Sequence, residues 1–96
     1  MGQAARAKPG RLAEKLLQIR ERLNLSQSEL VRHLGLMETI SRAKISEYER
    51  GEREPTLLIL LEYARAAGVC MDVLVDDKVD LPKVLPEKPK HKGLKE

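Results

Sequence analysis

The stretch from Gln27 to Pro55 holds the side chains best suited to recognising another molecule. It begins with a polar residue at the head of a short capped segment, and a glycine and a turn follow. It ends in a second segment whose outer face is small and polar. Such a face can form hydrogen bonds with the edges of DNA bases, because the major groove is about 12 Å wide and accepts one helix. The predicted chemistry is binding through hydrogen bonds and charge.

Residue sets typical of other chemistries do not occur in this sequence. It has no Ser/His/Asp set, no paired carboxylates of cleft type, no phosphate-cradling glycine loop and no cluster at metal-ligand spacing. His33 and His91 are far apart, and the single cysteine, Cys70, excludes an intramolecular disulfide. The apolar neighbours of Cys70 favour a small buried side chain. We therefore expect no enzymatic activity, no metal and no cofactor.

The balance of charge changes along the chain. Of a net charge of +3, residues 1–46 contribute nine lysines and arginines against four acidic residues. Residues 47–77 carry three against eight, and residues 78–96 carry six against three. The basic first half can face a polyanion while the acidic part faces away. The alternative is that these charges only keep a small domain in solution.

The length of 96 residues suits one small domain, and a hydrophobic content of 42% supplies a modest core. No run approaches the roughly 20 apolar residues of a membrane span, and the N-terminus has no signal-peptide pattern. We expect a cytoplasmic protein with a flexible arm over residues 1–8, a domain over residues 9–77 and a Pro/Lys-rich tail over residues 78–96. The end of the tail is predicted to be disordered. Its start can dock on the domain through Leu81, Val84 and Leu85.

The elements that must position the polar face are helices. A first amphipathic helix is indicated by apolar residues at spacings of four, three and four, which are Leu12, Leu16, Ile19 and Leu23. Ser26 and Glu29 form a capping box at the start of a second helix, which Gly35 ends. Ser41 begins a third helix that runs to about Arg50.

Two more helices complete an all-α bundle of five, and no segment alternates as a strand does. Thr56 caps the fourth helix and Gly68 stops it. Its residues 57–61 are apolar almost all round, which favours a central position or a surface shared with a partner. The fifth helix runs from Met71 to about Asp76.

The second and third helices together predict a helix-turn-helix. Leu30 and Val31 of the second helix can pack against Ile45 and Tyr48 of the third. The third helix can then lie in the major groove, while the second crosses the backbone and points its N-terminus at a phosphate.

These residues resemble the phage Cro/repressor-type helix-turn-helix domains, also called XRE-like. The resemblance covers roughly residues 12–76 and is strongest in the runs LSQSEL at 25–30 and ISEYERGEREP at 45–55. The second run, with its pattern I-S-x-Y-E-x-G-x-R-x-P, is quite specific. The resemblance implies a lambda-repressor-like five-helix bundle that binds operator DNA, commonly as a homodimer.

The resemblance also implies roles for individual residues. Gln27 matches the glutamine that contacts a phosphate and braces the recognition helix. Arg42 and Lys44 match positions that contact guanine or phosphate. Glu47 can accept from a cytosine amine or orient an arginine, and Arg50 matches a position that grips the DNA backbone. Each position also fits a plain solvated face. The full set implied to bind DNA is Gln27, Ser28, Ser41, Arg42, Ala43, Lys44, Ser46, Glu47 and Arg50.

Three features outside that set bear on how the helices pack. Glu49 fits a structural role, paired with an arginine of the bundle. Residues 37–40 are additional to the usual turn between the two motif helices. They either loop out, since closure entropy grows slowly with length, or extend the third helix, and Ile40 can make an added contact. This insertion leaves the approach of the recognition helix to the major groove open. Val31 replaces the small residue usual where the two helices touch, so we expect these helices to pack slightly further apart.

Two classes of function follow. The first is sequence-specific binding of double-stranded DNA by a small transcriptional regulator. It predicts one positive surface joining the first helix, Gln27, and Arg42 with Lys44. The homodimer expected for this class would use the fifth helix and the segment after it, with the candidates Val73, Val75 and Leu81. The second class is a protein-interaction module that reuses the fold, antitoxin-like or a component of a complex, which the acidic residues 47–54 and the apolar residues 57–61 favour.

Overall fold

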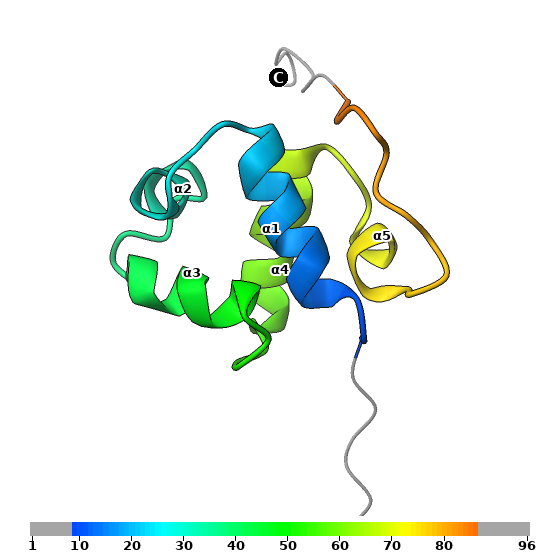
Figure 1. The fold of residues 1–96 in the computed structure, drawn as a ribbon. Helices are drawn as coiled ribbons and strands as arrows, with labels where there is room; N and C mark the ends of the chain where they lie inside the picture. The colour runs from blue at the N-terminus through cyan, green and yellow to red at the C-terminus, as the bar shows by residue number, and fades with distance from the viewer. Residues whose placement is uncertain (1–8, 87–96) are drawn as a thin grey trace, which may run out of the picture.

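The computed structural model describes residues 9–86, which contain five helices and no strand (Figure 1). The predicted all-α class is confirmed for this part of the chain. The predicted arm at residues 1–8 and the end of the tail from residue 87 onward lie outside the described residues. The helices are α1 (Leu12–Arg22), α2 (Gln27–His33), α3 (Arg42–Glu49), α4 (Leu57–Ala67) and α5 (Met71–Val75).

Helices α1 and α4 lie at the centre of the fold, with α2 and α3 on one side and α5 on the other (Figure 1). The apolar stripe of α1 is the reason for this arrangement, because a stripe about 100° wide can contact several neighbours. Every helix contributes to the one core cluster. Its most deeply buried apolar side chains include Leu16, Ile19, Leu30, Ile45, Tyr63 and Leu74.

Local capping sets the ends of α2. The Ser26 hydroxyl accepts a hydrogen bond from the Glu29 amide at 3.0 Å, and the Glu29 carboxylate accepts from the Ser26 amide at 2.8 Å. Gly35 follows the helix with a φ of +73°, a backbone region that glycine adopts at little cost. The predicted capping box and glycine stop are both confirmed.

Only one face of helix α4 is buried in the core. The Thr56 hydroxyl caps its first turn, and Ile59 and Leu60 are buried in the core. Leu57 and Leu58 are 71% and 74% exposed, so part of the predicted apolar run faces solvent. Within residues 9–86 no helix has both the length and the apolarity to cross a membrane.

Lys15 of α1 is fully buried in the core. Its ammonium group donates hydrogen bonds to the carbonyl oxygens of Val73 at 2.8 Å, Asp76 at 2.9 Å and Val79 at 2.6 Å. These carbonyls lie at and beyond the C-terminal end of α5, where a cation is favoured by the helix dipole. Three donors meeting three acceptors allow the buried charge to be tolerated.

Asp77 makes the reciprocal connection from the α5 side. Its carboxylate accepts hydrogen bonds from the amides of Gly10 at 2.8 Å and Arg11 at 3.0 Å, just before α1 begins. These two bonds lower the pKa of Asp77, because they stabilise the ionised carboxylate. The start of α1 and the end of α5 therefore hold each other through side chains some 60 positions apart.

The structure corrects two predictions about apolar residues near α5. Cys70 is exposed rather than buried, because its neighbours Val69 and Met71 occupy the space against the core. Leu81 is only 7% exposed and belongs to the core of its own chain, so it is not a surface residue for a second copy. Of the other tail residues, Leu85 packs on the core, while Val84 is exposed and does not hold the tail.

Candidate nucleic-acid interface

Helix α3 presents the outer face that the sequence predicts. Ile45 and Tyr48 are buried against the core, as predicted. The remaining residues of the predicted set on and before this helix are at least partly exposed, and they are Ser41, Arg42, Ala43, Lys44, Ser46, Glu47 and Arg50. The face is therefore open to a ligand along its whole length.

The carboxylate of Glu49 joins three parts of the fold behind that face. It accepts two hydrogen bonds from Arg20 of α1, one from Nε at 2.6 Å and one from Nη2 at 3.0 Å. It also accepts a hydrogen bond from the side-chain amide of Gln27 at 3.1 Å. The expected pairing of Glu49 with an arginine of the bundle is confirmed, and the Gln27 hydrogen bond connects the start of α2 to the last residue of α3. The Gln27 side chain is half-buried at the start of α2, next to the end of α3.

Glu47 lies on the outer face but is not an isolated negative charge. Arg53 donates to it at 2.7 Å, and the Lys44 ammonium lies 3.9 Å away. The hydrogen bond from Arg53 is the main reason why the pKa of Glu47 is lowered. Two cations around one carboxylate reduce the repulsion that Glu47 would exert on a phosphate.

Arg50 is already bonded within the protein. Its guanidinium holds the Glu52 carboxylate through two bonds of 2.9 Å, and it also donates to the hydroxyl of Ser46. The hydrogen bonds to the Glu52 carboxylate are the main reason why the pKa of Arg50 is raised. Binding of Arg50 to a DNA backbone would therefore require exchange of an exposed ion pair, which is a small cost.

The predicted extension of this surface over α1 fails for Lys15, which is fully buried, and for Arg20, whose guanidinium is held by Glu49. Arg11 bonds to the Asp77 carbonyl and pairs with Asp80. Lys15 and Arg20 are bonded as described above, and Arg22 donates to the carbonyl of Pro82. The α1 cations thus hold the domain together, because each finds an acceptor that lies on another segment.

Arg32 is a residue that the sequence reasoning missed. It lies in the last turn of α2, and it lines a hollow of about 290 Å³ together with Arg42. Residues 37–40 form a loop rather than an extension of α3, which begins at Arg42, and Met37 and Ile40 of this loop also line the hollow. A basic residue at the end of a helix is common for dipole reasons alone, so its type gave no separate signal.

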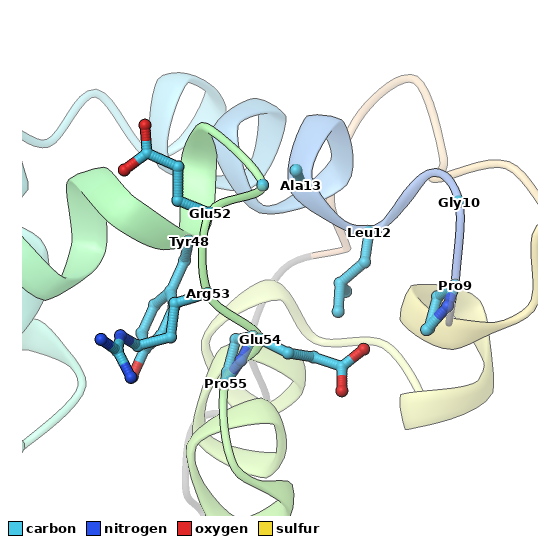
Figure 2. A pocket seen from close by; sticks show the side chains of 10 residues that line it. Pro9, Gly10, Leu12, Ala13, Tyr48, Glu52, Arg53, Glu54 and Pro55 are labelled. Carbon is cyan, nitrogen blue, oxygen red and sulfur yellow. The ribbon is translucent and has the colours of Figure 1, made fainter. Parts of the chain in front are cut away.

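A larger hollow of about 530 Å³ lies between the start of α1 and the loop after α3 (Figure 2). Tyr48 and Arg53 lie side by side there, and Glu52 and Glu54 point away from them (Figure 2). Two carboxylates against one guanidinium make this lining unsuited to a polyanion. In residues 9–86 no cluster of histidine, cysteine and acidic residues could hold a metal ion.

Two solved structures share this architecture. The P22 c2 repressor in complex with a synthetic operator superposes with a TM-score of 0.59 and 29% identity, over 69% of this chain and 94% of that one. A hypothetical transcription factor, NHTF from Neisseria, superposes with a TM-score of 0.57 and 26% identity, over 76% of this chain and 86% of that one. No curated protein sequence matches significantly.

The family comparison covers more than half of the sequence. The helix-turn-helix family model matches residues 16–74, which run from α1 into α5. This range includes the braced pair α2 and α3 and the core that supports them. The chain therefore belongs to the helix-turn-helix family of the phage Cro/repressor (XRE-like) type.

Proposed function

We propose that this chain is a transcriptional regulator that binds double-stranded DNA in a sequence-specific manner, with α3 in the major groove. The observation that carries this proposal is the open polar face of α3, held from behind by Glu49 through α1 and α2. A helix that reads base edges must keep its position while its outer side chains remain accessible, and this arrangement meets both needs.

The proposed roles of the site residues follow from their positions. Gln27 and Ser28, at the start of α2, meet a phosphate with the help of the helix dipole. Arg42 and Lys44 contact guanine edges or phosphates, and Glu47 orients Lys44 and Arg53 or accepts from cytosine. Ser41, Ala43, Ser46 and Arg50 complete the contact surface.

The protein is proposed to act as a homodimer, because one recognition helix reads only a few base pairs and a second copy supplies a second half-site. Leu57 and Leu58 support this proposal, since two adjacent leucines are largely exposed at the start of α4. Replacing both with serine should shift the sedimentation of a dimer toward that of a monomer. A cytoplasmic, non-enzymatic role belongs to the same proposal.

A binding selection with random duplex DNA at two salt concentrations tests the main proposal. We expect one enriched sequence, bound less tightly as salt rises because counterions are released from the DNA. The variant Arg42→Ala/Lys44→Ala should lose this binding, while Lys78→Ala/Lys83→Ala, which removes the same charge from exposed positions away from α3, should keep it. Failure to enrich any sequence would leave the protein-interaction module as the better explanation.

A further inference from the structure

We infer that the hollow between α2 and α3 binds one sugar–phosphate unit of the DNA backbone, and that the loop of residues 37–40 exists to build it. This inference rests on the proposed function and adds a contact that the usual short turn between the motif helices would not provide. The hollow is lined by Ser28, Val31, Arg32, Met37, Ile40, Ser41 and Arg42.

The two arginines are the first reason. Among residues 9–86, Arg32 and Arg42 are the only arginines whose side chains make no hydrogen bond or ion pair with other described residues. The arginines that have such partners are Arg11, Arg20, Arg22, Arg50, Arg53 and Arg65. Both unpaired guanidinium groups line the same hollow. A guanidinium carries five donors in a planar fork that matches a phosphate, so two of them favour an anionic occupant.

The start of α3 is the second reason. Ser41 occupies the N-cap position, yet its hydroxyl makes no capping hydrogen bond, unlike that of Ser26 at the start of α2. The first-turn amides of α3 are therefore not capped by a side chain, and they lie beside the unpaired Arg42. The hydroxyls of Ser28 and Ser41 are on exposed residues of the same lining and add further donors.

The floor of the hollow is the third reason. Val31 is buried and Ile40 packs on the core, whereas Met37 is 64% exposed at the rim. An apolar floor beneath a basic rim suits a deoxyribose ring with its phosphate better than it suits a free anion. No acidic residue lines the hollow: Glu38 lies on the loop outside the lining, and Glu29 is engaged in the capping box.

The test compares Arg32→Ala with Lys83→Ala on the duplex recovered by the selection and on a shuffled duplex. A lost phosphate contact should weaken binding to both duplexes equally, by about fivefold at 0.15 M salt, and should lower the salt slope by about 0.9. Lys83→Ala removes the same charge from an exposed residue outside the hollow and should change neither quantity. Little change in thermal unfolding is expected for either variant, because neither side chain makes a hydrogen bond or close ion pair with the described residues and the charge of Arg32 acts only on the exposed Glu29.

A second measurement locates the phosphate. Each phosphate of the selected duplex is replaced in turn by a neutral methylphosphonate. One position should weaken binding of the wild-type protein and have no further effect on Arg32→Ala, since the contact is already absent. Met37→Ala should weaken binding to the selected and the shuffled duplex alike, because it removes packing on the sugar and no base contact.

The outcomes separate this inference from the proposed function. If the wild type enriches a duplex and Arg42→Ala/Lys44→Ala abolishes binding, but Arg32→Ala keeps the wild-type affinity and salt slope, the hollow is not a phosphate site and the regulator remains. If Arg32→Ala changes which sequence is preferred, the hollow reads bases and the inference is wrong. If the wild type binds no duplex, both proposals are overturned.

Discussion

Arg20 and Glu49 form a two-pronged ion pair between α1 and the last residue of α3, with the Glu49 side chain only 6% exposed. Gln27 donates to the same carboxylate, so three elements of the fold meet at one acidic group. Because the pair lies behind the open face of α3, it controls the position of the recognition helix without touching a ligand.

Loss of Arg20 should therefore be costly. Arg20→Ala leaves the Glu49 carboxylate buried without its cation, and we expect the free energy of unfolding to fall by about 3 kcal/mol. Urea denaturation measures this change. Arg65→Ala is the matched control, since the pair of Arg65 with Glu62 is largely exposed and should be worth less than about 1 kcal/mol. Equal losses in the two variants would contradict the role given to Glu49.

Loss of Lys15 should destabilise the packing of α5 on α1 about as much as loss of Arg20 destabilises the packing of α3. Lys15→Met keeps the apolar stem but leaves the carbonyls of Val73, Asp76 and Val79 without their donor. We expect a loss of about 2–4 kcal/mol, because unsatisfied buried acceptors cost more than the packing retained. The exposed variant Lys78→Met should change the free energy of unfolding by less than about 0.5 kcal/mol. A Lys15→Met protein as stable as the wild type would show that the three hydrogen bonds contribute nothing.

The free energy of unfolding should depend on pH in the acidic range because of Asp77. Its pKa is lowered in the folded state by the amides of Gly10 and Arg11. The stabilisation is therefore present above the unfolded pKa of about 3.9 and is lost as pH falls through the folded value. The Asp77→Asn variant should be less stable than the wild type at neutral pH. Its stability should also decline less steeply than that of the wild type below pH 4. Thermal unfolding across this range measures both effects, and Glu38→Gln on the exposed loop should keep the wild-type profile.

Tyr63 offers a substitution that should stabilise the protein. Its hydroxyl is buried and makes no hydrogen bond with the described residues, and burial raises its pKa. Removing an unsatisfied polar group relieves a desolvation cost, so we expect Tyr63→Phe to raise the free energy of unfolding by about 1 kcal/mol. Tyr48→Phe, at a less enclosed hydroxyl, should have a smaller effect. Marked destabilisation by Tyr63→Phe would mean that the hydroxyl has a partner such as an ordered water.

The helices and the helix-turn-helix could be predicted from the sequence because their signals are local. The capping box of Ser26 and Glu29 and the stop at Gly35 involve residues a few positions apart. The spacing of Leu12, Leu16 and Ile19 likewise reports on a single helix face. The polar outer face of α3 follows from the same helical period.

Only the tertiary structure decided which charges serve the fold and which remain for a ligand. Lys15 finds its acceptors 58 to 64 positions away, and Arg20 finds Glu49 29 positions away. No local pattern distinguishes these cations from Arg32 and Arg42, which end at one hollow. The sequence by itself determined that a five-helix domain with a recognition helix would form. The long-range packing decided where its unpaired positive charge lies, because a side chain's partners depend on segments that meet only when the chain is folded.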